Sequence, residues 1–312
     1  MREWKSRSSV PGRPGLSASA FTLLRDLIEQ RTGVYFNDAK RELLEDRVGE
    51  LVAARGLPSL LDYYYLLKYD PGADAVWREL MDRLAVPETY FWRQPEHFTA
   101  LTEVILPRLA AAPPGRPLRI WSAACCSGEE PLSIAMALHE GGWFDRLPLE
   151  ITGSDASTAL VARARAGFYG DRSLRALSPE RRERWFRREG GAWRIDPGLH
   201  ARVAWTSANL LDPAAAGPLA GADVIFCRNV FIYFSDDAIR QVTRMFAERM
   251  PPWGYLFLGA SESLMRLTTD FVMDEIGPAF VYVRPSGDPS AGIAAGPPRL
   301  RAAPITSGAR RP

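Results

Sequence analysis

Apolar residues recur at helical spacing through the first part of the chain, from about residue 16 to residue 85. Phe21, Leu24 and Ile28 show this spacing, and no alternating segment interrupts the region. The pattern predicts four helices, with capping or turn residues at Gly33, Asp38 (N-cap of the second helix), Gly56 (its C-cap), Ser59 and Pro71. We therefore expect residues 16–85 to form a small all-helical domain.

Beyond residue 117 the pattern changes to short β-rich runs that alternate with helical segments. The predicted strands cover residues 118–123, 149–155, 201–208, 222–230, 255–260 and 280–284. Helices are expected around residues 129–140, 157–166 and 236–250. This alternation predicts an α/β domain over residues 117–284, with a parallel sheet covered by helices. In such sheets ligands bind beyond the carboxyl ends of the strands.

One segment, residues 167–200, interrupts the alternation. Its ALSPERRERWF run predicts a helix capped at Ser178, and GGAWRID is typical of the turn and edge of a small hairpin. We therefore expect an inserted subdomain between the second and third main strands. Residues 86–116 form the linker between the two domains. Residues 1–15 and 285–312 are predicted to be disordered tails, the second being rich in Pro, Gly, Ala and Ser.

The formal net charge of +2 is unevenly distributed along the chain. Each tail carries four basic residues and one acidic residue, so the part between them has a net charge of −4. Nucleic-acid-binding domains usually carry their positive charge on the folded part, so we expect no nucleic-acid partner. No apolar run reaches the roughly 18–20 residues of a membrane span, and no secretory signal begins the chain. We expect a cytoplasmic protein without membrane insertion. The three cysteines and three histidines lack metal-ligand spacing, so no metal site is expected.

The loop after the first predicted strand consists of small residues, SAACCSG at 122–128, before a helix that opens with Glu129 and Glu130. Small side chains let a ligand approach the backbone, and a helix N-terminus adds a positive end. The two carboxylates repel phosphate but suit an ammonium group. This favours a cationic ligand such as S-adenosylmethionine over NAD or ATP. The segment is equally consistent with a tight turn whose acidic residues stabilise the helix dipole.

Polar residues also follow the later strands. Asp155 ends the second strand, where a carboxylate accepts both ribose hydroxyls in dinucleotide folds; the alternative is a helix N-cap. After the third strand, Asn209 and Leu210 suit the recognition and covering of an adenine, although Asn209 is more often a turn residue. Arg228 and Asn229 follow the strongly apolar fourth strand. All five residues are expected at one edge of the sheet.

Two further polar residues lie beside aromatic runs. Tyr233 follows the fourth strand in a run that otherwise predicts core packing. In the linker, three adjacent aromatic residues at 90–92 precede Arg93. Such a run indicates that the linker packs on the domain, with Arg93 held over a cleft. The alternative is a hydrophobic anchor followed by an exposed arginine.

Together these segments resemble the CheR family of chemoreceptor glutamate methyltransferases. The matching motifs are PETYFWRQPEHF, RIWSAACCSGEEPLSIAM, SDAS, FCRNVFIYF and GYLFLGASES. Their order and spacing agree over residues 18–284, as does the helical first domain. The resemblance implies an α/β class I methyltransferase (Rossmann-like) fold. That fold has a mostly parallel seven-stranded sheet, a small all-helical N-terminal domain and a small inserted subdomain.

The resemblance also implies a protein-glutamate O-methyltransferase that uses S-adenosyl-L-methionine and releases S-adenosyl-L-homocysteine. Its substrates would be glutamate side chains on the cytoplasmic helices of methyl-accepting chemotaxis proteins, and it would act as a monomer. The family's cofactor contacts fall on Thr89, Arg93, Ala123, Glu129, Asp155, Asn209, Leu210, Arg228 and Asn229. The family's residues nearest the transferred methyl group match Arg93 and Tyr233.

The sequence departs from the family pattern at three places. Pro87 stands where many members have asparagine, which removes a side-chain amide contact to the cofactor. Cys125 and Cys126 are expected to be small packing residues. The short loop REGGAWRID predicts that the protein does not need a receptor's C-terminal pentapeptide as a tether.

The residue content suits the implied reaction. A glutamate side chain has a pKa of about 4.3, so it is an anion at neutral pH and needs no general base. A sulfonium methyl donor needs no metal. Arg93 is expected to hold the carboxylate and keep it ionised, and Tyr233 to donate a hydrogen bond or fix the geometry. The run NVFI at 229–232 lacks the prolines of many amine methyltransferases, which argues against DNA or amine substrates.

The second predicted helix offers a surface for the substrate. Its basic residues share one half of the helix with apolar residues, and they are Lys40, Arg41, Arg47 and Arg55. A basic and apolar face suits an acidic receptor helix. The alternative is that the arginine stems lie over a core stripe. Two other functions stay open on the sequence: a non-catalytic signalling scaffold with the methyltransferase fold, and a methyltransferase for a small molecule.

Overall fold

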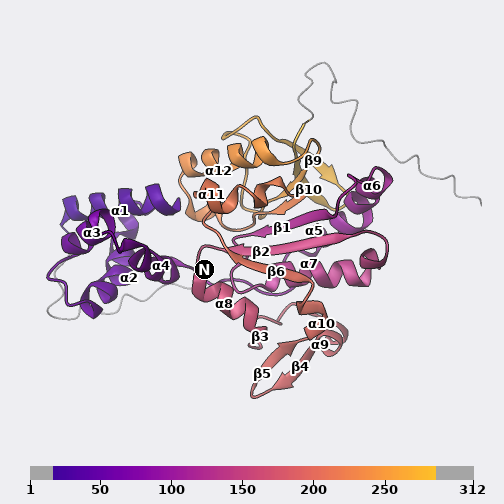
Figure 1. The fold of residues 1–312 in the computed structure, drawn as a ribbon, viewed down its shortest axis with the longest axis horizontal. Helices are drawn as coiled ribbons and strands as arrows, with labels where there is room; N and C mark the ends of the chain where they lie inside the picture. Colours follow the sequence, from indigo (N-terminus) through magenta and orange to yellow (C-terminus); the bar gives the residue numbers. More distant parts are fainter. Residues whose placement is uncertain (1–16, 286–312) are drawn as a thin grey trace, which may run out of the picture.

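A computed structural model of the chain describes residues 17–285 (Figure 1). Its first part is a helical domain, as the apolar spacing predicts. The helices are α1 (Ala18–Thr32), α2 (Arg41–Ala54), α3 (Leu60–Tyr69) and α4 (Ala73–Leu84), with the 3-10 turn η1 (Asp38–Lys40) before α2. Leu24, Ile28, Leu44, Val48 and Leu80 form part of a core that belongs to this domain alone.

The helix ends follow the expected capping residues with two exceptions, one at each end of α2. Gly56 is not the C-cap of α2, because Arg55 takes that position and Gly56 lies one residue further on. Ser17 accepts a hydrogen bond from the Ala20 N–H at the start of α1, and Gly33 ends the helix in the left-handed conformation. Ser59 caps α3. The expected N-cap Asp38 is wrong, because η1 intervenes and α2 begins at Arg41 without a side-chain cap.

The second part is a seven-stranded sheet with the strand order β6-β2-β1-β7-β8-β10-β9. The strands are β1 (Leu118–Ala123), β2 (Leu149–Asp155), β6 (Val203–Ser207), β7 (Val224–Phe226), β8 (Tyr255–Phe257), β9 (Val272–Ile276) and β10 (Ala279–Val283). The first five strands in this order, from β6 to β8, are parallel to one another. Strand β10 runs antiparallel to both β8 and β9. The mostly parallel seven-stranded sheet is confirmed.

Helices cover both faces of the sheet. One core gathers residues of α5 (Pro95–Ala100), η2 (Leu101–Ile105), α6 (Leu106–Ala111) and α7 (Glu129–Glu140). A second core, on the other face, includes α11 (Pro213–Ala216), η4 (Leu219–Gly221) and α12 (Asp236–Arg249). Four other short helices and turns connect the strands, namely η3 (Trp143–Asp145), α8 (Thr158–Ala166), α10 (Pro197–His200) and η5 (Phe231–Tyr233).

The predicted insertion is a small subdomain below the main sheet in Figure 1. It contains β3 (Phe168–Tyr169), α9 (Pro179–Trp185), β4 (Phe186–Glu189) and β5 (Ala192–Ile195). Ser178 caps α9, as predicted. Gly190 and Gly191, both with positive φ, turn the predicted hairpin between β4 and β5. The two-residue strand β3 was not predicted.

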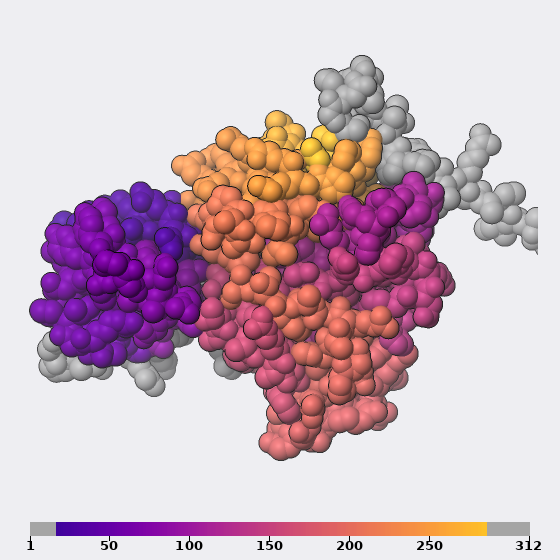
Figure 2. Space-filling view, in the orientation of Figure 1, coloured from indigo at the N-terminus to yellow at the C-terminus, as the bar shows by residue number. Residues whose placement is uncertain are grey.

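The helical domain lies against one end of the α/β domain (Figure 2). In the part of the chain that the structure describes, no helix is long and apolar enough to cross a membrane. The predicted disordered tails, residues 1–15 and 285–312, fall outside the described residues except for Pro285.

Candidate active site

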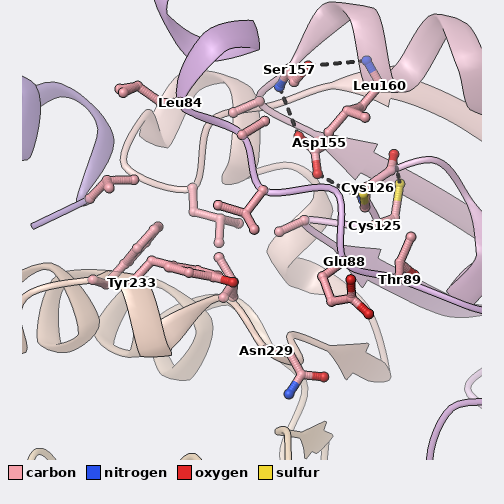
Figure 3. Close-up of a pocket in the computed structure, with 18 of the residues that line it drawn as sticks. Leu84, Glu88, Thr89, Cys125, Cys126, Asp155, Ser157, Leu160, Asn229 and Tyr233 are labelled. Atoms are coloured by element: carbon pink, nitrogen blue, oxygen red, sulfur yellow. Dashed lines mark hydrogen bonds between the residues drawn. The ribbon is translucent and has the colours of Figure 1, made fainter. Parts of the chain in front are cut away.

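A cavity of about 290 Å³ lies at the carboxyl ends of the parallel strands, where the helical domain meets the sheet (Figure 3). Its wall includes predicted site residues from both domains, namely Lys40, Arg47, Thr89, Arg93, Asp155, Asn209, Leu210, Arg228, Asn229 and Tyr233. Tyr233 lies across the cavity from Asp155 and Cys126 (Figure 3). The edge of the sheet therefore brings together residues that are far apart in the sequence.

The loop after β1 is held in an unusual backbone conformation. Ala124, Cys126 and Gly128 all have positive φ, of 56°, 54° and 95°. A Cβ atom at Gly128 would lie 2.8 Å from the Trp205 ring and 2.9 Å from the Ala164 Cβ, so only glycine fits there. The small residues thus shape the loop as well as leaving space beside its backbone.

Asp155 fixes this loop from the end of β2. One carboxylate oxygen accepts a hydrogen bond from the Cys126 N–H over 2.8 Å, and the other accepts from the Ser157 N–H over 2.9 Å. Burial raises the pKa of the Asp155 carboxyl, and these two N–H groups oppose the shift. Ser157, and not Asp155, caps α8, because its hydroxyl accepts from the Leu160 N–H. Asp155 is therefore available to a ligand in the cavity.

A carboxylate from the helical domain supports the same corner. Asp82 of α4 accepts hydrogen bonds from the Ser157 hydroxyl over 2.6 Å and from the Ala159 N–H over 3.1 Å. The Thr158 hydroxyl donates to its second oxygen over 3.3 Å. Asp82 thus binds the start of α8 from across the domain boundary.

We expect Asp82→Ala to weaken cofactor binding several-fold, because the start of α8 carries Ser157, which donates to Asp155. The lost cap should also cost about 1–2 kcal/mol of stability. Calorimetric titration with S-adenosylmethionine checks the affinity. Asp74→Ala is the matched control, since Asp74 lies in the same helix and makes only an exposed ion pair with Arg31. Equal affinities of the two variants would contradict the role of Asp82.

Arg228 is the most heavily bonded side chain at the edge of the cavity, and it is 1% exposed. Its guanidinium donates to the Arg93 carbonyl over 2.7 Å and to Gln94 Oε1 over 2.7 and 3.2 Å. It also pairs with Glu130 at 3.3 Å. Burial lowers the pKa of Arg228, and the charge of Glu130 opposes this. Arg228 therefore joins the end of β7, the linker and α7.

Two of the predicted cofactor residues lie behind the cavity wall. Ala123 is fully buried at the end of β1. Glu129 is 2% exposed, and its oxygens accept hydrogen bonds from the hydroxyls of Ser127 and Ser173 over 2.8 and 2.9 Å. The adjacent acid, Glu130, lines the cavity instead. No sequence signal distinguishes two neighbouring glutamates at the start of a helix.

Asn229 depends on a residue to which the sequence assigned no role. Asn229 has a φ of 60°, and its N–H donates to the Glu262 carboxylate over 2.7 Å. The Gly259 N–H donates to the same oxygen over 2.6 Å. A Cβ atom at Gly259 would lie 2.4 Å from the Asn229 amide nitrogen. The GASES motif therefore supplies both an anchor for the Asn229 backbone and space for its side chain.

The guanidinium groups of Arg93 and Arg47 share the cavity wall with Tyr233. Burial raises the pKa of its hydroxyl, and the charges of Arg93 and Arg47 oppose this shift. Arg93 comes from the linker, where it donates to the Glu88 carbonyl over 3.1 Å. Arg47 comes from α2 and donates to the Leu84 carbonyl over 2.5 Å. The cavity thus combines a tyrosine hydroxyl with two guanidinium groups, which suits a carboxylate substrate.

Of the four basic residues proposed for substrate docking, two line the cavity and two do not. Lys40 and Arg47 line the cavity. Arg55 forms an ion pair with Glu79 of α4 and lies over the Tyr63 ring, whereas Arg41 is outside the cavity wall. The part of α2 nearest the site is therefore its first half.

The two cysteines and Pro87, where the sequence departs from the family pattern, lie in or beside the cavity wall. Burial raises the pKa of the Cys126 thiol to about 12 and that of the Cys125 thiol as well, so both stay protonated and pack as small side chains. Pro87 is exposed between two cavity-lining residues, Val86 and Glu88. Among the described residues, no group of three or more His, Cys, Asp or Glu side chains could hold a metal ion.

Family models match almost the whole described chain. Residues 87–278 match the CheR methyltransferase SAM-binding domain, and residues 19–85 match the CheR methyltransferase all-alpha domain. The chain belongs to the CheR methyltransferase family. The cavity described above lies between the SAM-binding domain and the all-alpha domain of this CheR-family enzyme, and S-adenosylmethionine is its methyl donor.

Curated relatives agree with this membership. Chemotaxis protein methyltransferase 1 of Pseudomonas aeruginosa is 36% identical over 272 residues, which cover 84% of this chain and 96% of the relative. A chemotaxis protein methyltransferase of Vibrio anguillarum is 38% identical over 263 residues, covering 82% and 93%. The probable biofilm formation methyltransferase WspC of Pseudomonas putida is 34% identical over 270 residues, covering 86% of this chain and 62% of that protein.

Proposed function

We propose that this CheR-family enzyme methylates glutamate side chains on the cytoplasmic helices of methyl-accepting chemotaxis proteins. The observation that carries the proposal is the convergence of Arg93, Arg47 and Tyr233 on the cavity between the SAM-binding domain and the helical domain. The names of the curated relatives, chemotaxis protein methyltransferases, support a chemoreceptor as the substrate. Since the methylated part of such a receptor is cytoplasmic, the enzyme acts in the cytoplasm.

The cofactor is held mainly by residues at the strand ends. Its sulfonium supplies an electrophilic methyl group. A carboxylate has about four acceptor positions, so Asp155 can bind both ribose hydroxyls while it keeps its two backbone N–H partners. Asn209 and Leu210 contact the adenine. Thr89 and Asn229 contact the remaining polar groups. Arg228 forms part of the wall, and Ala123 and Glu129 support it from behind.

The substrate carboxylate needs orientation more than activation. Arg93 binds it by charge-assisted hydrogen bonds and keeps it ionised, and the Tyr233 hydroxyl donates a further hydrogen bond. The helical domain closes this side of the cavity and excludes water, which strengthens these interactions. Holding the carboxylate oxygen in line with the methyl group then accounts for most of the catalysis.

The receptor helix docks along the first half of α2. Lys40 and Arg47 lie at the cavity and attract acidic residues that flank the methylated glutamate. Arg41 extends this surface. Arg55 follows the far end of α2, where it is paired with Glu79, and a receptor helix would reach it only by running along the whole of α2. A substrate that binds both domains explains why the cavity opens between them.

Tyr233→Phe tests the proposed chemistry. We expect kcat to fall about tenfold, because one hydrogen bond to the carboxylate is lost, while the affinity for S-adenosylmethionine stays unchanged. The assay measures transfer of a radiolabelled methyl group to a purified cytoplasmic fragment of a methyl-accepting chemotaxis protein. The product is a methyl ester that releases methanol in alkali.

A receptor fragment with its methylated glutamates replaced by glutamine is the substrate control, and it should accept no label. Label that is stable in alkali would mean that the group modified is not a carboxylate, which would overturn the proposed substrate class. Full activity of Tyr233→Phe would remove the hydroxyl from the mechanism but leave the substrate class intact.

A further inference from the structure

The residues that follow α1 run against the segment that carries Tyr233. Val34 forms an antiparallel bridge with Phe234, and the Tyr35 N–H donates to the Tyr233 carbonyl over 2.8 Å. We name this pairing the α1 seam, which consists of Gly33, Val34 and Tyr35 on one side and Tyr233, Phe234 and Ser235 on the other. The helical domain therefore binds the backbone of a residue whose side chain lines the cavity.

Gly33 allows the two sides of the α1 seam to approach each other. Its φ is 77°, and its carbonyl accepts from the Ser235 N–H over 3.1 Å. A Cβ atom at this position would lie 2.9 Å from two carbons of the Phe234 ring and 3.2 Å from the Ala238 Cβ. Any other residue must therefore push the Phe234 side of the seam away or distort the end of α1.

The end of α1 is fixed independently of the seam. The Asn209 side chain donates to the Arg31 carbonyl over 2.6 Å, which holds the last turn of α1 to the α/β domain. Because α1 is held on this side, a larger residue at position 33 displaces Phe234. Tyr233 precedes Phe234 in the chain and moves with it.

From this geometry we infer that Gly33 is a positioning residue for methyl transfer, through which the helical domain sets the place of the Tyr233 hydroxyl. The inference rests on the proposed function, in which that hydroxyl holds the substrate carboxylate. Gly33 touches neither substrate nor cofactor in this scheme. It acts through the α1 seam, so its loss should affect turnover and leave cofactor affinity in place.

The chain contains a matched control for this inference. Gly56 also follows a helix and has a positive φ, of 63°, but a Cβ atom there would meet nothing within 4 Å. Gly33→Ala and Gly56→Ala therefore impose similar backbone strain, and only the first disturbs the seam. Both full-length proteins would be compared for thermal stability, for S-adenosylmethionine affinity by calorimetry, and for kcat and KM on a receptor fragment.

We expect Gly33→Ala to lower kcat roughly tenfold to a hundredfold, as sub-ångström to ångström displacements of catalytic groups do. Its cofactor dissociation constant should change less than about threefold, and Gly56→Ala should keep its kcat. Gly33→Ala should cause no further loss when it is combined with Tyr233→Phe, because both changes remove the same hydrogen bond.

Several results would overturn the inference. Equal kcat values for Gly33→Ala and Gly56→Ala would show that the seam does not position the hydroxyl. A loss of cofactor affinity as large as the loss of kcat would indicate general distortion of the site. If Tyr233→Phe lowers kcat and Gly33→Ala lowers it further in the double variant, Gly33 acts by another route. Full activity of Tyr233→Phe alone would instead contradict the proposed role of Tyr233.

A second variant guards against failure of Gly33→Ala to fold. Phe234→Leu loosens the α1 seam without strain at position 33, since it shortens the side chain that packs on Gly33. We expect the same split, with reduced kcat and retained cofactor affinity. Unchanged kcat in this variant would also contradict the inference.

Discussion

Asp155→Ala is expected to weaken the binding of S-adenosylmethionine about a hundredfold, because hydrogen bonds to a charged group contribute about 1.5–3 kcal/mol. The substitution removes the acceptor for the two ribose hydroxyls. It also leaves the N–H groups of Cys126 and Ser157 without their carboxylate partner. The loop after β1, which has three residues with positive φ, then keeps the Cys125 N–H bond to the Ser154 carbonyl but loses its side-chain anchor to β2. Both effects lower affinity.

Calorimetric titration with S-adenosylmethionine and with S-adenosylhomocysteine measures this loss, and both ligands should be affected equally because they share the ribose. Asp212→Ala is the control. Asp212 follows the neighbouring strand β6 and accepts from the Ala214 N–H, but it is not part of the cavity wall. Wild-type affinity in Asp155→Ala would show that the ribose is bound elsewhere.

The sequence predicts the parts of the fold in which local pattern and burial agree. The strands β1, β2 and β7 lie in the interior of the sheet, and their positions were predicted from short β-rich runs. The sequence of β9 did not predict a strand. It lies at the edge of the sheet, where four of its five side chains are exposed, so it shows no pattern of buried positions. Only the resemblance to CheR proteins implied a seventh strand. An edge strand that buries one side chain is specified by its partner, β10, and not by its own pattern.

The candidate site was predictable to a similar extent. Asp155, Arg228 and Tyr233 converge because the carboxyl ends of parallel strands share one edge of a sheet. No comparable rule predicts which residues of the two domains contact each other. Asp82 and Ser157 are 75 residues apart, and Asn209 and Arg31 are 178 residues apart. No spacing or motif marks such pairs. The sequence did point to the basic face of the second helix, and Lys40 and Arg47 line the cavity, but the contacts that join the two domains became visible only in three dimensions.

Arg228→Met is expected to destabilise the protein by about 3–5 kcal/mol, the usual cost of removing one partner of a buried ion pair. Methionine fills much of the space of the arginine side chain, so packing is largely kept. Glu130, which is 15% exposed, would lose its counter-charge. The Arg93 carbonyl and Gln94 would lose their donors at the turn that aims Arg93 into the cavity. Activity should therefore fall together with stability.

Thermal unfolding measures the effect, and a decrease in Tm of about 10 °C corresponds to such a loss. Arg240→Met is the control. Arg240 pairs with Asp237 at 2.8 Å and with Asp236 at 4.0 Å, and all three side chains are exposed, so we expect a loss of at most about 1 kcal/mol. Arg228→Met combined with Glu130→Leu should be more stable than Arg228→Met alone, because no unpaired charge is left in the interior. If Arg228→Met melts within a degree or two of Arg240→Met, the buried arginine does not hold the linker to the sheet, and Arg93 must owe its position to the aromatic packing of the linker instead.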